Sequence, residues 1–281
     1  MHAFEAFTVA DLPGRAATPP AGAGQPTLGS APLLRAVSLT RRFGGLTAVN
    51  AVSLDLHLGQ VHAVIGTNGA GKSTLINMLS GELPASSGDI HLAAQTITPW
   101  SQPRRARAGV GRSYQRTTIF PEFSVLENCR LCAQAAQPRA WALWQAAQRC
   151  DDSLAAASDA LRDAGLSDAA AQTAGTLSHG GKRQLEIAMC LATRPQVLLL
   201  DEPLAGMGAQ ECDLMLGLLA ALKRTHAVLL VEHDMDAVFR IADRITVMVN
   251  GEVIATDVPE RIRTNHAVQV AYLGDAHGEG L

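Results

Sequence analysis

Hydrophobic and polar positions alternate along two early segments of the chain and then give way to an apolar run. Residues 34–40 alternate, and residues 52–58 alternate strictly, which predicts two strands with one buried face each. Residues 61–65 (Val-His-Ala-Val-Ile) predict a fully buried strand that runs directly into a glycine-rich turn. A helical pattern over residues 73–79 follows that turn.

Strand and helix patterns alternate through the second half of the chain. The expected helices span residues 182–192, 210–224 and 235–242, and the expected strands span residues 196–200, 227–231 and 245–249. Because strands that alternate with helices form parallel sheets, we expect an α/β fold with a mainly parallel sheet and helices on both faces. Between the halves, residues 128–176 are rich in Ala, Gln and Leu at helical spacing and predict an inserted helical subdomain.

Composition narrows the class of protein. The chain has 281 residues, of which 47% are hydrophobic and 17% charged, which favours a folded chain with a sizeable core. Residues 1–30 are rich in Pro, Gly and Ala, and we expect a flexible tail there. The net charge of -3 argues against a nucleic-acid partner. The apolar runs are far shorter than the ~20 residues of a membrane-spanning helix, and the acidic N-terminus lacks a secretory pattern, which predicts a cytoplasmic location.

The glycine-rich turn matches a phosphate-binding loop. Its sequence from Gly66 to Ser73 fits G-x-x-x-x-G-K-[ST] between a predicted strand and a predicted helix. Small residues let backbone N–H groups converge on an anion, and the following helix adds the positive end of its dipole. Lys72 is a mobile cation for the phosphates, and the Ser73 hydroxyl is placed to ligate Mg²⁺. The candidate nucleotide-binding residues are Gly66, Thr67, Asn68, Gly69, Ala70, Gly71, Lys72, Ser73 and Thr74.

Two acids end the next apolar strand. Residues 197–200 (Val-Leu-Leu-Leu) lead into Asp201 and Glu202. A carboxylate that leaves a buried strand beside a phosphate loop can anchor Mg²⁺, which is the role predicted for Asp201. Glu202 can orient and deprotonate a water molecule that attacks the terminal phosphate, so we expect it to be catalytic.

A second anion site is predicted at the start of the helix near residue 182. Residues 177–181 (Leu-Ser-His-Gly-Gly), called the signature segment below, would expose Ser and Gly amides at a helix N-terminus. With this segment the chain resembles the ATP-binding subunits of ABC transporters, over roughly residues 33–274. The resemblance implies a P-loop ATPase with an antiparallel N-terminal sheet, one ATP-binding domain over residues 31–281, and a helical subdomain at about 116–190.

Further site residues follow from the resemblance. Phe43 matches the aromatic residue that stacks on adenine. Gln115 matches a glutamine that contacts Mg²⁺ and the attacking water and links the site to the membrane partner. His233 matches a histidine that contacts the γ-phosphate. The resemblance implies the cofactors ATP and Mg²⁺, with Ser73, Gln115 and Asp201 at the metal.

The resemblance also implies that the signature segment contacts ATP held by a second subunit. The residues concerned are Ser178, His179, Gly180 and Gly181. His179 and Gly181 depart from the family's Leu-Ser-Gly-Gly-Gln, and Gly208 stands where the family often has Asp. We expect activity to survive with altered contacts across the dimer.

Several passages are similar to one branch of the family, the importers of branched-chain or other hydrophobic amino acids. They are residues 42–50, 123–128, 185–188, 231–236 and 271–274. The hypothesis is an ATP-hydrolysing subunit of such an importer, in which head-to-tail dimer closure acts on membrane permeases. Import of urea or a short-chain amide stays open, and a soluble ABC ATPase without a transport role and a non-catalytic ATP-binding module are further alternatives.

The expected partners follow from this hypothesis. They are a second ATPase subunit (in a homo- or heterodimer), two integral-membrane permease subunits and, indirectly, a periplasmic substrate-binding protein. The chain is expected to lie peripherally at the cytoplasmic face of the inner membrane, with coupling surfaces near Gln115 and residues 119–123.

Five arginines cluster before and after the predicted coupling loop. They are Arg104, Arg105, Arg107, Arg112 and Arg116. Because the chain is acidic overall, we expect a solvated surface and not a nucleic-acid site.

Overall fold

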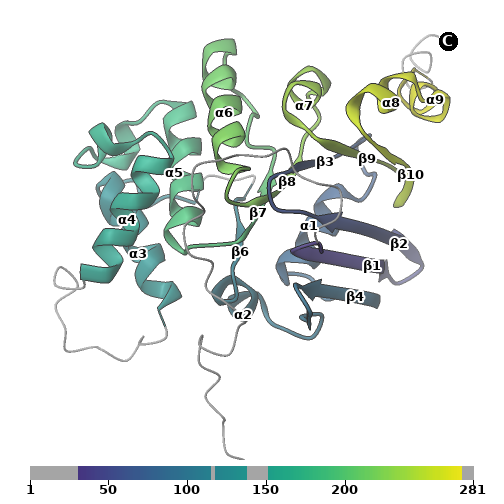
Figure 1. Cartoon of the computed structure of the whole chain (residues 1–281), viewed down its shortest axis with the longest axis horizontal. Helices are drawn as coiled ribbons and strands as arrows, with labels where there is room; N and C mark the ends of the chain where they lie inside the picture. The colour runs from purple at the N-terminus through teal and green to yellow at the C-terminus, as the bar shows by residue number, and fades with distance from the viewer. Residues whose placement is uncertain (1–30, 115–117, 138–150, 274–281) are drawn as a thin grey trace, which may run out of the picture.

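The computed structural model describes residues 31–114, 118–137 and 151–273 (Figure 1). The predicted tail (1–30), Gln115 and Arg116 lie outside the described residues. Among the residues that are described, no helix is both long enough and apolar enough to cross a membrane.

An antiparallel sheet is built from the first two alternating segments. Its strands, in sheet order, are β2 (Leu46–Leu56), β1 (Leu34–Phe43), β4 (Ser87–Leu92) and β5 (Gln95–Thr96). The predicted strand at 34–40 is confirmed within β1. The predicted strand at 52–58 ends two residues early, because Leu58 is half exposed and the chain turns at Gly59, whose φ is +82°.

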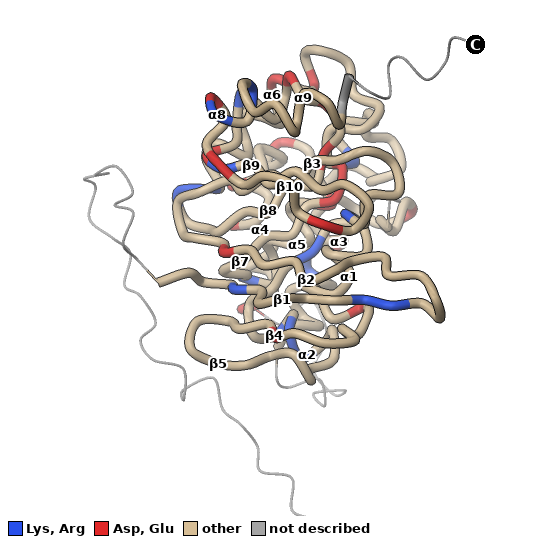
Figure 2. Tube along the Cα trace, turned by 90° about the vertical axis from the view of Figure 1, so that its right-hand side faces the viewer, with Lys and Arg blue, Asp and Glu red and all other residues tan. Residues whose placement is uncertain are grey.

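The larger sheet is mainly parallel. Its strands, in sheet order, are β10 (Glu252–Asp257), β9 (Arg244–Val249), β3 (Val61–Gly66), β8 (Ala227–Val231), β7 (Val197–Asp201) and β6 (Val110–Arg112). All pairs are parallel except β10 with β9. Every residue of β3, β7 and β8 is buried, which explains their continuous apolar runs. In Figure 2 the antiparallel strands β1, β4 and β5 lie below this sheet.

Helices cover the parallel sheet and form a separate group beside it. They are α1 (Lys72–Ser80), α2 (Gln102–Arg107), α3 (Val125–Ala136), α4 (Asp151–Asp163), α5 (His179–Ala192), α6 (Ala209–Leu222), α7 (Met235–Ile241), α8 (Pro259–Thr264) and α9 (His266–Leu273). In Figure 1, α3, α4 and α5 stand together on the left, as expected for the inserted helices. Short 3₁₀ turns at Ser167–Ala169 and Ala174–Thr176 link α4 to α5.

The two larger apolar clusters lie on opposite faces of the parallel sheet. Leu198 and Leu200 of β7 pack with α3, α4, α5 and α6 on one face. Val197 and Leu199 of the same strand pack with α1, β1 and β2 on the other. The predicted helices on both faces of the sheet are therefore confirmed, with the difference that the antiparallel sheet shares one face with α1.

The predicted arginine surface is wrong for Arg105 and Arg112. Arg105 is only 2% exposed, and its guanidinium donates to the carbonyl oxygens of Met78 (2.7 Å) and Leu79 (2.9 Å) at the end of α1. It also donates to the carbonyl oxygens of Thr98 and Trp100. Burial lowers the pKa of Arg105 to about 10, so the group remains charged at neutral pH. The carbonyl oxygens at the C-terminal end of α1 carry the negative end of the helix dipole, which explains why a cation is buried here.

Candidate nucleotide-binding site

The loop between β3 and α1 passes very close to other backbone segments. A Cβ at Gly66 would lie 2.2 Å from the Met248 carbonyl oxygen, and one at Gly71 would lie 2.4 Å from the Ala48 carbonyl oxygen. Gly71 also has a φ of +97°, which favours glycine. As the N-cap of α1 it supplies no side-chain hydrogen bond, so the first amides of α1 are suited to an anion.

Lys72 lies at the first position of α1 and folds back over this loop. Its Nζ donates to the carbonyl oxygens of Gly66 (2.6 Å) and Thr67 (3.0 Å). Burial lowers the pKa of the ammonium, while the carboxylates of Glu202 and Asp201 act in the opposite direction. Lys72 begins α1, and α1 contacts β7, the strand that ends in Asp201. Ser73, the next residue, is exposed.

Asp201 and Glu202 lie where β7 ends, beside β8. Asp201 is 5% exposed, and burial raises the pKa of its carboxyl group while nearby Arg112 lowers it. Glu202 has a φ of +48°, an uncommon conformation for a residue with a side chain, and its N–H donates to the Val231 carbonyl oxygen (2.9 Å). Strained backbone of this kind gathers at functional sites. The Glu202 side chain is 22% exposed, whereas Asp201 is buried. The two adjacent carboxylates therefore lie in different surroundings.

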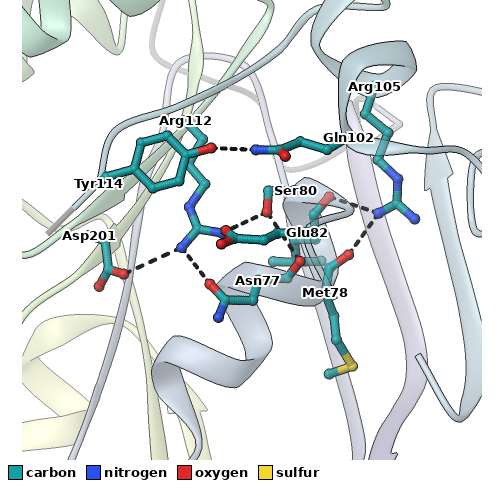
Figure 3. A network of polar contacts seen from close by, with 10 residues as sticks. Asn77, Met78, Ser80, Glu82, Gln102, Arg105, Arg112, Tyr114 and Asp201 are labelled. Carbon is teal, nitrogen blue, oxygen red and sulfur yellow. Dashed lines mark hydrogen bonds and ion pairs between the residues drawn. The ribbon is translucent and has the colours of Figure 1, made fainter. Parts of the chain in front are cut away.

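Arg112 connects Asp201 to the end of α1 (Figure 3). Its Nη2 lies 3.7 Å from Asp201 Oδ2 and also donates to Asn77 Oδ1. Its Nη1 donates to Ser80 Oγ (2.7 Å) and to Glu82 Oε2 (2.8 Å). The side chain is 8% exposed, so a cation is buried beside the predicted metal-anchoring carboxylate. The sequence pattern did not show this role, because Arg112 stands among four other arginines.

His233 follows β8 and faces the same acids. Its Nδ1 lies 3.8 Å from Glu202 Oε1 and 3.8 Å from Glu232 Oε2, and its ring is 61% exposed. His233 and Glu202 therefore lie next to each other in the fold. An exposed imidazole beside a carboxylate is suited to bind a phosphate oxygen or to exchange a proton.

Glu232 is a site residue that the sequence reasoning missed. Its carboxylate is fully buried; Oε1 accepts from the Leu204 N–H (2.9 Å) and Oε2 from the His233 N–H (3.2 Å). It thereby ties the turn that follows Glu202 to the segment that carries His233. Burial raises the pKa of Glu232. The signal in the sequence was that Glu232 follows an apolar strand and precedes a histidine. A carboxylate buried at the end of such a strand requires specific hydrogen-bond partners.

The signature segment forms the start of α5, three residues before the predicted helix. Ser178 is the N-cap, and its Oγ accepts from the Gly181 N–H (3.1 Å), which explains the earlier start. Its partners in the same chain belong to α6 and the turn before it. Glu211 Oε1 lies 3.1 Å from both Ser178 Oγ and the Gly180 nitrogen. His179 Nε2 donates to the Ala205 carbonyl oxygen (3.0 Å).

The remaining predicted residues lie at the edges of the site. Phe43 ends β1 with its ring 45% exposed, and the Arg41 guanidinium lies 4.6 Å from the ring centroid. A ring in this position is available for stacking. Gln115 is outside the described residues, but Thr118 nearby donates its N–H to the buried Glu186 (2.9 Å) on α5.

Family models match two parts of the chain. The model described as "ABC transporter" covers residues 49–205, which include the phosphate loop, the signature segment and both acids. The model described as "Branched-chain amino acid ATP-binding cassette transporter" covers residues 252–278.

Curated relatives match nearly the whole chain. The "High-affinity branched-chain amino acid transport ATP-binding protein BraF" of Pseudomonas aeruginosa is 41% identical over 88% of this chain and 100% of its own length. The protein of the same description called LivG, from Escherichia coli K12, is 40% identical over 88% of this chain and 100% of its own length.

Solved structures agree with the fold. A nucleotide-free ATP-binding cassette from an ABC transporter has a TM-score of 0.77 at 28% identity, over 85% of this chain and 98% of that one. An ATP-binding cassette in its ADP conformation has a TM-score of 0.77 at 27% identity, over 87% and 100% of the two chains. The predicted fold class, ATPase activity and family are confirmed: the chain belongs to the ABC transporter ATPases, in the family of the ATP-binding proteins of branched-chain amino acid transport.

Proposed function

We propose that this chain hydrolyses ATP to energise import of branched-chain or other hydrophobic amino acids. The observation that carries the cargo class is the match of residues 252–278 to the branched-chain model, together with 40–41% identity to relatives named for that transport. The proposal includes one ATP-binding domain over residues 31–281, preceded by a tail.

ATP is assigned to the loop between β3 and α1. Residues 66–74 bind the phosphates through backbone N–H groups and the ammonium of Lys72, and Phe43 stacks on the adenine. The N-terminus of α1 supports this, because its N-cap Gly71 supplies no side-chain hydrogen bond and leaves the first amides of the helix to an anion. Lys72 exchanges its two carbonyl partners for phosphate oxygens when the nucleotide enters.

Mg²⁺ is assigned to Ser73, Gln115 and Asp201. The donor set fits a hard cation, since it consists of hydroxyl, amide and carboxylate oxygens. Asp201 supports the assignment further, because its carboxylate is buried, with its pKa raised, where a nearby cation would offset the cost of burial. When bound, Mg²⁺ neutralises charge on the phosphates of ATP.

Hydrolysis is assigned to Glu202 with His233. Glu202 accepts a proton from the water whose oxygen bonds to the γ-phosphorus, as the bond from that phosphorus to ADP breaks. His233 donates a hydrogen bond to a γ-phosphate oxygen and so withdraws charge. Glu232 is a positioning residue in this scheme, because its two hydrogen bonds fix the backbone on both sides of the reacting groups.

The proposed partners follow from membership of the ABC transporter family. Ser178, His179, Gly180 and Gly181 contact ATP held by a second ATPase subunit, in a homo- or heterodimer. Two permease subunits bind near Gln115 and residues 119–123, with a periplasmic binding protein beyond them and this chain at the cytoplasmic face of the inner membrane.

A cavity supports that docking place. Its volume is about 200 Å³, and it lies between β6 and helices α3 and α5. Tyr114, Thr118, Cys132, Glu186 and Met189 are among its lining residues. A permease segment seated there would contact both the core and the inserted helices, so a relative movement of the two would reach the membrane subunits.

The cargo is tested by uptake in the source organism. We expect deletion of the gene, with the other subunits intact, to abolish high-affinity uptake of radiolabelled leucine while leaving urea uptake unchanged. Complementation with the original chain restores uptake, whereas Lys72→Ala does not. Loss of urea uptake with normal leucine uptake would contradict the amino-acid assignment and favour the urea alternative, to which the Ser-His-Gly signature is also similar.

A further inference from the structure

Glu211 reaches from the first turn of α6 to the first turn of α5. Its Oε1 accepts hydrogen bonds from the Ser178 hydroxyl (3.1 Å) and the Gly180 N–H (3.1 Å), and its Oε2 lies 3.4 Å from the Gly208 nitrogen. The carboxylate touches the backbone of the signature segment directly, because a Cβ at Gly180 would lie 2.7 Å from Glu211 Oε1.

The donors that Glu211 occupies are those assigned to the nucleotide. A γ-phosphate oxygen bound at the signature segment needs the Ser178 hydroxyl and the Gly180 amide, and both are bonded to one carboxylate oxygen of the same chain. These hydrogen bonds hold the pKa of Glu211 below its usual range, so the group is an anion at neutral pH. Two anions cannot share these donors, because each N–H or O–H satisfies one strong acceptor and the like charges repel.

A second contact holds the same segment to the same region. His179 Nε2 donates to the Ala205 carbonyl oxygen (3.0 Å), and a Cβ at Gly206 would lie 3.1 Å from that nitrogen. His179 is one of the departures from the family pattern, and the neighbouring turn ends at another, Gly208. The signature segment is thus tied to the turn between Glu202 and α6 by two side chains.

We propose that Glu211 is an internal competitor of ATP at the signature segment: its carboxylate occupies the donors in the open chain and must leave before ATP carried by a second subunit can bind there. This inference rests on the function proposed above. It follows that Glu211 raises the ATP concentration at which two chains close on each other, and that removing its charge lowers that concentration.

A purely structural role for Glu211 leads to the opposite expectation. Glu211 is the third residue of α6, where an acid can cap the helix through the Gly208 N–H. If capping were its only role, its loss would destabilise α6, which adjoins the signature segment, and would leave closure unchanged or make it harder. The two roles are therefore separated by the direction of the change in closure.

The experiment titrates dimer formation with ATP in the full chain. The parent is Glu202→Gln, which slows hydrolysis, and the added changes are Glu211→Gln and Glu211→Ala. Asp213→Asn is the matched control, because this acid lies on the same helix but pairs with Arg240 (2.7 Å). Sedimentation velocity measures the dimer, a fluorescent ATP analogue measures binding by the monomer, and urea unfolding measures stability.

We expect Glu211→Gln and Glu211→Ala to lower the ATP concentration for half-maximal dimer formation by about tenfold, as loss of a competing charged hydrogen bond implies. Monomer binding and the Asp213→Asn control stay at the parent values. An unchanged or higher ATP requirement in Glu211→Gln would overturn the proposal while leaving the ATPase assignment intact. Absence of an ATP-dependent dimer in every variant, the parent included, would instead contradict the proposed function and this inference with it.

Discussion

Phe43 is the residue of the proposed adenine site that mutation can isolate most cleanly. Its ring is 45% exposed at the end of β1, and it pairs across the hairpin with Leu46, which is 66% exposed. Because stacking on a base is worth about 1–3 kcal/mol, we expect Phe43→Ala to weaken ATP binding roughly tenfold. Phe43→Tyr should retain the affinity, and so should Leu46→Ala. Equilibrium binding of ATP measures the effect, and unchanged affinity in Phe43→Ala would remove this ring from the adenine site.

His62 gives the chain a predictable response to acid. Its ring is buried in β3, where Nδ1 donates to the Asp55 carbonyl oxygen (3.0 Å) and Nε2 accepts from Thr246 Oγ1 (2.8 Å). Burial lowers its pKa from 6.5 to about 4. The unfolded chain therefore takes up a proton before the folded chain does. The stability that neutral His62 provides is complete above pH 6.5 and is lost as the pH falls towards 4.

We expect this loss to reach roughly 3 kcal/mol of unfolding free energy, since one pKa unit corresponds to about 1.4 kcal/mol. His62→Gln keeps polar atoms at the site without a titrating group, so its stability should fall less over the same range. Urea unfolding at several pH values measures the difference between the two proteins. Parallel losses in both would show that His62 does not titrate as described.

At the scale of elements, the apolar pattern predicted buried segments well and very short or charged segments poorly. The strands at 61–65 and 227–231 and the helix at 73–79 were predicted to within one residue at each end, because their burial is continuous or strongly periodic. The three residues of β6 are too few for a period to show, and half of α2 is arginine, so it has no apolar pattern.

Most of the site and core residues that the sequence pattern did not predict are charged groups in the interior. From the sequence Arg105 was expected at the surface, but in the structure its guanidinium donates to the Met78 and Leu79 carbonyl oxygens at the end of α1. Glu232 likewise bonds two amides whose proximity depends on the tertiary fold. The phosphate loop, in contrast, is a local motif whose spacing alone carries its geometry, so this part of the site was predictable.

At the scale of the whole molecule, the proposed ATP contacts divide between two regions of one chain. The phosphate loop, Glu202 and His233 lie at the ends of β3, β7 and β8, whereas the signature segment begins α5 and bonds to α6. Two chains arranged head to tail would each complete the other's site. ATP binding would then close the pair, and hydrolysis would release it, which couples the nucleotide to attached membrane subunits.

The central claim is that Glu202 is the base for hydrolysis in a site that closes around ATP. The exposed Glu260→Gln on α8 serves as the control and should hydrolyse ATP at the original rate. The direct test is ATP turnover by Glu202→Gln, measured with ATP binding and dimer formation in the same preparation. We expect turnover to fall by about 10²–10⁴-fold while ATP binding persists and the ATP-bound dimer accumulates. Undiminished hydrolysis by Glu202→Gln would contradict the account.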